Sequence, residues 1–194
     1  MLKMLPNILT FGRLVLTVIF LVMILYSPSI EDNTRFLDLA FILFVIAGLT
    51  DMIDGTVARR LHVTSKLGRI MDPLADKVLV VGSFLCFAII TRPLLFDFST
   101  ITLRIIHWAT FGIIITRELS VTILRQFAES KGIAFGATAS GKIKMFLQSF
   151  AIGTVIVKMA HVQIAAWGNW FTASVYAIMI FITVFSGVRS IQRT

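Results

Sequence analysis

Four aspartates fall in one short segment of an otherwise apolar chain, where they form two pairs. Asp51 and Asp54 are three residues apart, and Asp72 and Asp76 are four residues apart. Either spacing places both members of a pair on one face of a helix. A carboxylate at the centre of a membrane helix costs about 2.5–3.5 kcal/mol on insertion scales, so four of them need compensation. Two such faces predict a site for one or two divalent cations, and bound cations can in turn hold phosphate groups.

The ligand chemistry of this segment favours Mg²⁺ or Mn²⁺. All four candidate ligands offer oxygen, which suits these cations better than zinc. Four clustered carboxylates repel one another, so some of them would take up a proton or a metal ion. A single aspartate could also be a helix cap or a partner in an ion pair, but the full pattern favours a metal site. The three histidines, His62, His107 and His161, are dispersed, which favours surface or interface positions over metal ligation.

The residues after the first pair are typical of a surface that accepts a phosphate-bearing ligand. Gly55 removes a side chain beside Asp54, which lets a ligand approach the backbone closely. Ala58 lies on the same face as the aspartates and keeps the next helical turn shallow. Arg59 offers a planar guanidinium fork that matches phosphate geometry. These residue types therefore predict a phosphate or nucleotide site next to the metal site.

The segment between the two pairs is expected to form a loop over the site. Residues 60–71 are polar and basic, and Gly68 would give this loop a bend. Asp72 followed by Pro73 is a helix start signal, with aspartate at the N-cap and proline at the first helical position. Asp76 follows one turn later, on the face of Asp72.

The composition predicts an all-α integral membrane protein with a single domain over residues 1–194. The chain is 57% hydrophobic and 14% charged, whereas a soluble domain carries about 25% charged residues. Six segments of about 20 residues are long enough to cross a membrane. The N-terminal one shows no cleavage site and is expected to be retained. One cysteine, Cys86, excludes an intrachain disulfide framework. The expected spans are about 8–26, 36–58, 73–91, 101–126, 142–161 and 169–190.

The distribution of basic residues predicts the orientation in the cell membrane. With six spans both termini share a side, and fourteen of the 18 lysines and arginines lie on that side. Since cytoplasmic loops carry the excess of lysine and arginine, both termini and all four aspartates are expected to face the cytoplasm. The net charge of +8 then suits anionic membrane lipids and anionic soluble substrates. Nucleic acid is not an expected partner, because the basic residues are scattered among short loops.

The aspartate segment resembles the signature of the CDP-alcohol phosphotransferase family over LTDMIDGTVARRLHVTSKLGRIMDPLADK. The resemblance implies this family's helical membrane fold, its active site at the cytoplasmic face, and a homodimer. It implies an enzyme that displaces CMP from a CDP-linked lipid such as CDP-diacylglycerol with an alcohol. The aspartates would bind two divalent ions, and Asp76 would be the general base. The residues implied to cradle the CDP group are Asp51, Asp54, Gly55, Ala58, Arg59 and Gly68.

Flanking motifs resemble the branch of the family whose acceptor is glycerol 3-phosphate. They are LPNILTFGRL at 5–14, ITRELSVTILR at 115–125 and SGKIKM at 140–145. Arg117, about two turns inside the fourth span, needs a partner, a cavity or a bound anion. Glu118 points about 100° away and is not expected to be its full partner. Arg117, Arg125 and Lys142 are therefore predicted to form a basic pocket for the acceptor phosphate, and Lys144 to face the opposite side.

Three hypotheses remain alongside this interpretation. Asn7, Thr10 and Arg13 share one face near the N-terminus, and they either border the CDP site or cap and anchor the first span. The acceptor could be another alcohol, such as inositol phosphate or, as in cardiolipin synthesis, phosphatidylglycerol. A divalent-cation transporter is a third class, but all four aspartates lie at one membrane face, which argues against an ion path. Metal-dependent release of CMP would separate the enzyme from the transporter.

Overall fold

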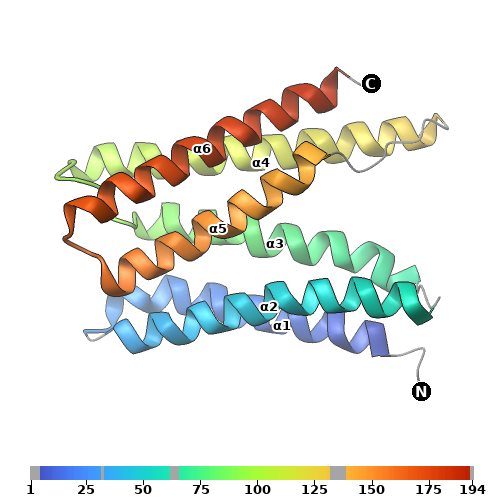
Figure 1. The fold of residues 1–194 in the computed structure, drawn as a ribbon, viewed down its shortest axis with the longest axis horizontal. Coiled ribbons are helices and arrows are strands. Elements are labelled where there is room, and N and C mark those ends of the chain that lie inside the picture. The colour runs from blue at the N-terminus through green and yellow to red at the C-terminus, as the bar shows by residue number, and fades with distance from the viewer. Residues whose placement is uncertain (1–4, 32, 62–65, 132–138, 193–194) are drawn as a thin grey trace. The chain divides into compact units, whose positions relative to one another are not determined.

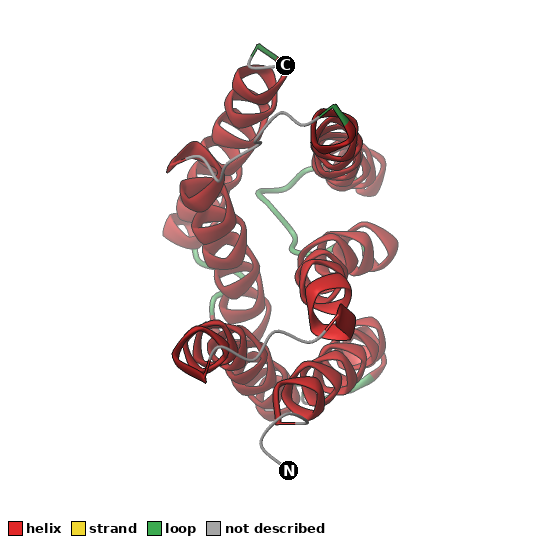
Figure 2. Cartoon of the chain, turned by 90° about the vertical axis from the view of Figure 1, so that its right-hand side faces the viewer, coloured by secondary structure: helices red, strands yellow, loops and turns green. Residues whose placement is uncertain are grey.

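A computed structural model describes residues 5–31, 33–61, 66–131 and 139–192 of the protein. Side chains are described at 11–31, 33–50, 74–128, 130–131 and 141–192. All regular secondary structure in these ranges is helical, as the cartoon in Figure 2 shows. The chain divides into two compact units, Met1–Ile90 and Thr91–Thr194.

The described part of the first unit contains three long helices. α1 spans Leu5–Tyr26 and continues into the short 3-10 turn η2 at Ser27–Ser29, α2 spans Thr34–Leu61, and α3 spans Lys66–Ile90. α1 packs against both α2 and α3, and α2 and α3 run in opposite directions (Figure 1). Since only residues 62–65 separate α2 from α3, the end of α2 lies within about 19 Å of the start of α3.

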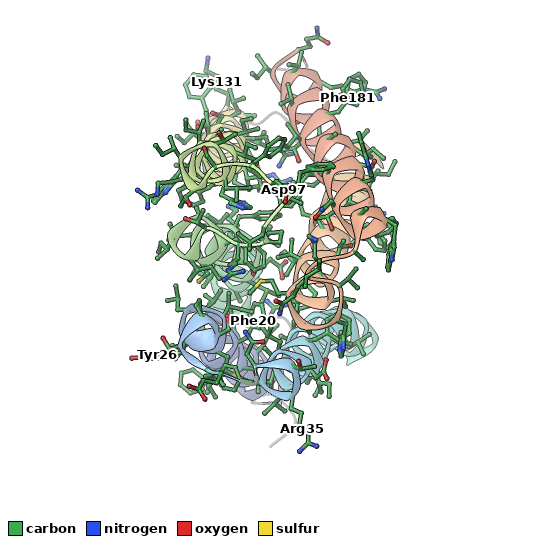
Figure 3. All side chains as sticks on the ribbon, turned by 90° about the vertical axis from the view of Figure 1, so that its left-hand side faces the viewer. Phe20, Tyr26, Arg35, Asp97, Lys131 and Phe181 are labelled. Carbon is green, nitrogen blue, oxygen red and sulfur yellow. The ribbon has the colours of Figure 1, made fainter. Side chains whose placement is uncertain are left out.

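Aromatic and small residues pack α1 against its two neighbours. Phe20 is fully buried, and its ring centroid lies 5.5 Å from that of Phe44 on α2. A Cβ added to Gly82 of α3 would lie 2.7 Å from Leu21 Cδ1, so α3 approaches α1 closely at this glycine. Figure 3 shows Phe20 inside this unit and Tyr26 pointing away from it. This packing sets which faces of α2 and α3 turn toward α1.

The described part of the second unit also contains three long helices. α4 spans Thr100–Ser130, α5 spans Ala139–His161, and α6 spans Ala166–Ile191. α6 packs against both α4 and α5. Apart from the adjacent Val175 and Tyr176, its buried residues recur every three or four positions, which is the stripe expected of a helix with one packed face. They are Gly168, Thr172, Val175, Tyr176, Met179, Thr183, Ser186 and Ser190.

Two buried basic side chains hold the loops of the second unit. Lys158 Nζ donates to the carbonyl oxygen of Val162 at 3.2 Å and to Asn169 Oδ1 at 2.8 Å. These bonds tie the end of α5 to the start of α6. His107 is buried, with Nε2 3.1 Å from the carbonyl oxygen of Pro93. Both side chains are thus accounted for by structural hydrogen bonds.

Each of the six predicted segments falls on one helix, apart from its boundary residues, but the expected start of the third helix is wrong. α3 already begins at Lys66, so Asp72 is not an N-cap and Pro73 lies inside the helix. Gly68 accordingly lies in the first turn of α3 and not in a loop. A proline inside a helix is tolerated where neighbouring groups satisfy the freed backbone carbonyl, which is common in membrane proteins.

Three helical stretches among the described residues are long and apolar enough to cross a membrane. They are Phe11–Ser29, Gly141–His161 and Ala166–Ile191. Each has at least the 18 or so residues that a helix needs to span the hydrocarbon core. These stretches indicate a helical membrane protein.

Candidate active site

The two aspartate pairs lie at similar distances from the ends of α2 and α3 that the short link joins. Asp54 lies seven residues before the end of α2 and Asp72 six residues after the start of α3. At 1.5 Å per residue, these positions are about 10 Å and about 9 Å from the two helix ends that the short link joins. Asp51 and Asp76 each lie ten residues, or about 15 Å, from the same ends. Because α2 and α3 run antiparallel (Figure 1), all four positions fall at one end of the unit.

For most of the predicted nucleotide-binding and metal-binding residues, the structure describes a helical backbone but not the side chain. The helices therefore confirm that each aspartate pair lies on a single helix, at the spacing that shares a face. The roles predicted for these side chains stay predictions. They are Asn7, Thr10, Asp51, Asp54, Gly55, Ala58, Arg59, Gly68 and Asp72.

Asp76 forms an ion pair with an arginine from the first helix. Arg13 Nη1 lies 3.1 Å from Asp76 Oδ1, and the Arg13 side chain is only 2% exposed. A buried arginine on an apolar helix requires an anionic or polar partner, which α3 supplies here. Asp76 itself is 33% exposed, so its carboxylate remains accessible from one side. The contact therefore orients the candidate general base, and it connects α1 to the aspartate site through Arg13.

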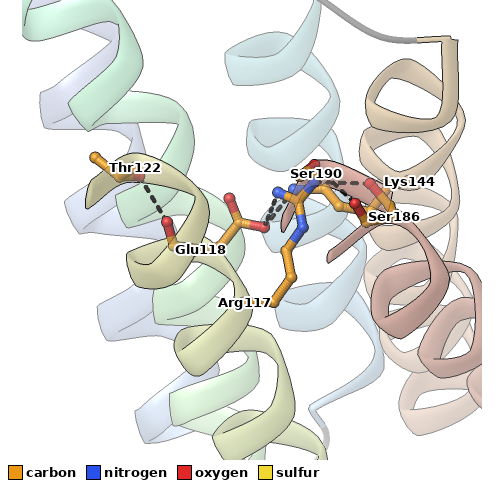
Figure 4. Close-up of polar contacts among 6 residues, drawn as sticks. All are labelled: Arg117, Glu118, Thr122, Lys144, Ser186 and Ser190. Carbon is orange, nitrogen blue, oxygen red and sulfur yellow. Dashed lines mark hydrogen bonds and ion pairs between the residues drawn. The ribbon is translucent and has the colours of Figure 1, made fainter. Parts of the chain in front are cut away.

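A second polar cluster lies in the other unit and is centred on Arg117 of α4 (Figure 4). Arg117 Nη1 lies 3.1 Å from Glu118 Oε1, and Nη2 donates to Ser186 Oγ of α6 at 2.8 Å. Glu118 was not expected to be the full partner of Arg117, because it lies about 100° away around the helix. The long arginine side chain nevertheless reaches the carboxylate of Glu118, which is one of its two partners. Ser186 supplies the second partner that the helix α4 itself could not provide.

Lys144 of α5 completes this cluster. Its Nζ donates to Glu118 Oε1, the oxygen that also accepts from Arg117. Lys144 is buried, whereas Lys142 and Arg125 are exposed. The two lysines do face opposite sides, as expected, but Lys144 rather than Lys142 lies beside Arg117. A phosphate-binding role for Lys142 and Arg125 stays a prediction.

Three residues of these two clusters were not among the predicted site residues: Glu118, Lys144 and Ser186. Arg13 was predicted either to border the CDP site or to anchor the first span, but its contact with Asp76 was not predicted. For the charged ones a signal was present, because a charge within an apolar segment needs a partner. Glu118 and Lys144 both lie in such a segment. No comparable signal marks Ser186, since serine is common on packed faces of membrane helices.

Taken together, long apolar helices define a helical membrane protein whose first unit carries two aspartate pairs toward one end of α2 and α3. The chain belongs to the CDP-alcohol phosphatidyltransferase family, whose model matches residues 3–185. This match covers both the aspartate pairs of the first unit and the Arg117 cluster of the second.

Curated relatives resemble the chain over most of its length. The "Probable phosphatidylglycerophosphate synthase" of Mycobacterium tuberculosis (strain ATCC 25618 / H37Rv) is 34% identical over 190 residues, covering 97% of this chain and 80% of the relative. The "CDP-diacylglycerol--glycerol-3-phosphate 3-phosphatidyltransferase" of Bacillus subtilis (strain 168) is 30% identical, covering 94% and 91%. A Rickettsia typhi protein with the latter name is 29% identical over 155 residues, covering 80% and 77%.

Proposed function

We propose that the protein transfers the phosphatidyl group of CDP-diacylglycerol to glycerol 3-phosphate, which yields phosphatidylglycerophosphate and CMP. The observation that carries this proposal is the pair of aspartate-bearing helices in a chain that belongs to the CDP-alcohol phosphatidyltransferase family. The names of the relatives from Bacillus subtilis and Rickettsia typhi, which give glycerol 3-phosphate as acceptor, support the choice of acceptor. The reaction is a step of phospholipid biosynthesis.

The four aspartates would hold one or two Mg²⁺ or Mn²⁺ ions. The fit rests on an oxygen-only donor set at matching levels of two antiparallel helices, with Asp76 partly exposed. Bound divalent ions would neutralise the pyrophosphate of CDP-diacylglycerol and the charge that develops on it. The small and basic residues between the pairs, Gly55, Ala58 and Arg59, would accommodate the CDP group.

Asp76 would act as the general base. Its carboxylate accepts the proton of the attacking hydroxyl, whose oxygen forms a bond to the lipid-bearing phosphorus. The bond from that phosphorus to the bridging oxygen breaks, and CMP leaves. Arg13 holds one carboxylate oxygen of Asp76, so the base enters the reaction with its charge compensated and its orientation set.

An acceptor panel tests the proposed function. Purified protein would be incubated with CDP-diacylglycerol, Mg²⁺ and one acceptor at a time: glycerol 3-phosphate, glycerol, inositol phosphate or phosphatidylglycerol. CMP release would be measured together with the lipid product. The proposal expects glycerol 3-phosphate to give the highest kcat/KM. Preference for another acceptor would place the protein in a different branch of the family, and absence of CMP release with every acceptor would contradict the enzyme assignment.

We also propose that all six helices cross the cell membrane and that the aspartates face the cytoplasm. The support is the length of the helices, each of at least 22 residues, and the bias of lysine and arginine toward one side. Both termini would then be cytoplasmic, and CMP and glycerol 3-phosphate would exchange with the cytosol. The homodimer implied by the family resemblance stays a prediction.

Cysteine labelling in intact cells is expected to give this orientation. In a Cys86→Ala background, Ser65→Cys lies in the link between α2 and α3 and should resist an impermeant maleimide until the cells are opened. Asp97→Cys, in the exposed loop before α4, is the matched control and should react in intact cells. The opposite pattern would invert the topology, and equal labelling of both positions would contradict the six-span arrangement.

Replacing Arg117 is expected to weaken binding of the acceptor selectively. Arg117→Lys keeps the charge but loses the guanidinium fork, and charged hydrogen bonds contribute about 1.5–3 kcal/mol each, so KM for glycerol 3-phosphate should rise about tenfold. Arg117→Ala should raise it further. KM for CDP-diacylglycerol should change little in either variant.

The matched control for Arg117 is Arg104→Lys, since Arg104 is an exposed arginine on the same helix. Its kinetics should equal those of the wild type. A wild-type KM for glycerol 3-phosphate in both Arg117 variants would remove Arg117 from the acceptor site. The acceptor phosphate would then have to be bound elsewhere.

A further inference from the structure

We propose that Glu118 is a positioning residue of the acceptor site, which holds Arg117 and Lys144 together for the acceptor phosphate. The inference rests on the proposed function and adds a residue with no direct role in phosphate binding. The cluster joins three helices: Arg117 and Glu118 lie on α4, Lys144 on α5 and Ser186 on α6 (Figure 4).

Two cations converge on one carboxylate oxygen of Glu118. Arg117 Nη1 and Lys144 Nζ both donate to Glu118 Oε1. Both cations are largely buried, with side-chain exposures of 11% and 5%. Like charges repel at such separations, and the repulsion is stronger in a low-dielectric interior than in water. The Glu118 carboxylate is therefore what allows the two cations to stay side by side before an anion arrives.

The guanidinium group of Arg117 is held by acceptors on two helices. Glu118 and Ser186 engage Nη1 and Nη2 and so fix the plane of the guanidinium. Among the described residues, none accepts a hydrogen bond from the buried Nε of Arg117. Guanidinium donors lie in a fixed fork, so fixing the plane also fixes the direction of Nε–H. Glu118 and Ser186 thus set the orientation of the whole Arg117 guanidinium group.

The cluster lies close to the start of α5 and to the end of α6. Lys144 lies five residues after the start of α5, and Ser186 five residues before the end of α6, which is about 7.5 Å along each helix. A lysine side chain can extend over such a distance and carry its ammonium group to water. Without the carboxylate of Glu118, Lys144 would lose its ion pair with α4, and we expect its ammonium group to move away from Arg117.

The test is a kinetic comparison of Glu118→Gln and Glu118→Asp with the wild type. Glu118→Gln should raise KM for glycerol 3-phosphate about tenfold, the scale of one charged hydrogen bond, with KM for CDP-diacylglycerol unchanged within about twofold. Glu118→Asp keeps the charge and should recover part of the loss. A purely structural role would reduce the amount of folded enzyme and the apparent kcat without moving KM. Asp97→Asn, an exposed carboxylate in the same unit, is the matched control.

A double-mutant cycle tests whether Glu118 acts through Lys144. In a Lys144→Gln background, Glu118→Gln should have a much smaller effect on KM for glycerol 3-phosphate than in the wild type. The reason is that substitutions of residues in one network do not have additive effects. If Glu118→Gln does not fold, Ser186→Ala provides the second variant. It removes the acceptor of Arg117 Nη2 and should raise KM for glycerol 3-phosphate severalfold.

Several outcomes would overturn the inference. The inference is overturned if those of the variants Glu118→Gln, Glu118→Asp and Ser186→Ala that fold have a wild-type KM for glycerol 3-phosphate. If Glu118→Gln has the same effect in the wild type and in the Lys144→Gln background, Glu118 does not act through the lysine. A lower KM in Glu118→Gln would mean that the carboxylate competes with the phosphate. The proposed function fails separately, if the wild-type protein releases no CMP from CDP-diacylglycerol and glycerol 3-phosphate.

Discussion

Replacing Asp51 or Asp72 by asparagine should abolish CMP release while leaving a folded protein. Asparagine keeps the size of the side chain but removes the charge that would hold a divalent cation at the proposed metal site. Loss of a residue that only supports a metal ligand typically costs about 10–100-fold, so loss of a ligand itself should cost more than about 100-fold. Turnover should likewise stop in excess EDTA and return with Mg²⁺ or Mn²⁺. The measurement is CMP release by detergent-purified protein, with size-exclusion chromatography to report folding.

The control for these variants is Asp97→Asn, which makes the same chemical change at an exposed loop position. It should keep wild-type activity. Full activity of either Asp51→Asn or Asp72→Asn, or turnover that persists in EDTA, would contradict the proposed metal site on α2 and α3. Because asparagine is nearly isosteric with aspartate, a loss of activity with an unchanged elution profile would locate the defect in the site and not in the fold.

The second large effect is expected for Asp76→Asn. Removing a general base usually lowers the rate by about 100-fold or more. Binding of CDP-diacylglycerol should be largely retained, since three aspartates would remain. Asparagine also keeps an amide oxygen that can accept a hydrogen bond from Arg13, whereas Asp76→Ala would leave this buried arginine without its carboxylate. Single-turnover rates would measure the role of Asp76 as a base, and equilibrium binding of CDP-diacylglycerol would measure its role in substrate binding.

Loss of CDP-lipid binding with an unchanged rate at saturation would reassign Asp76 from base to ligand. Arg13→Lys provides an internal comparison, because it keeps the charge beside Asp76 but not the fork of donors. If Arg13 orients the base, this variant should lower kcat more than it raises KM for either substrate. An unchanged kcat would limit Arg13 to anchoring α1 against α3.

The sequence alone was sufficient for the helical architecture and for the aspartate pairs. Apolar segments of membrane-spanning length predict helices, since backbone groups in a bilayer must be satisfied within the segment. All six predicted segments are helical. The spacing of Asp51 with Asp54, and of Asp72 with Asp76, depends only on 3.6 residues per turn. Local periodicity therefore fixed which positions share a face.

The start of α3 shows where local signals fail. Asp72–Pro73 has the residues of a helix start, yet the helix begins at Lys66. Such a start signal indicates that a helix can begin at this position. It does not exclude that the preceding residues are helical as well. The tertiary context decided this boundary. As a result Asp72 lies within a helix, at the level of Asp54 on α2.

Side-chain partners across helices were decided by the tertiary structure alone. Arg13 meets Asp76 because α1 packs against α3, and Arg117 meets Ser186 because α6 packs against α4. The sequence showed that Lys142 and Lys144 face opposite sides of α5. It did not show which side faces Glu118, because that depends on the rotation of one helix against its neighbours. This rotation results from the packing of whole helix faces, whereas residue spacing describes only one helix at a time.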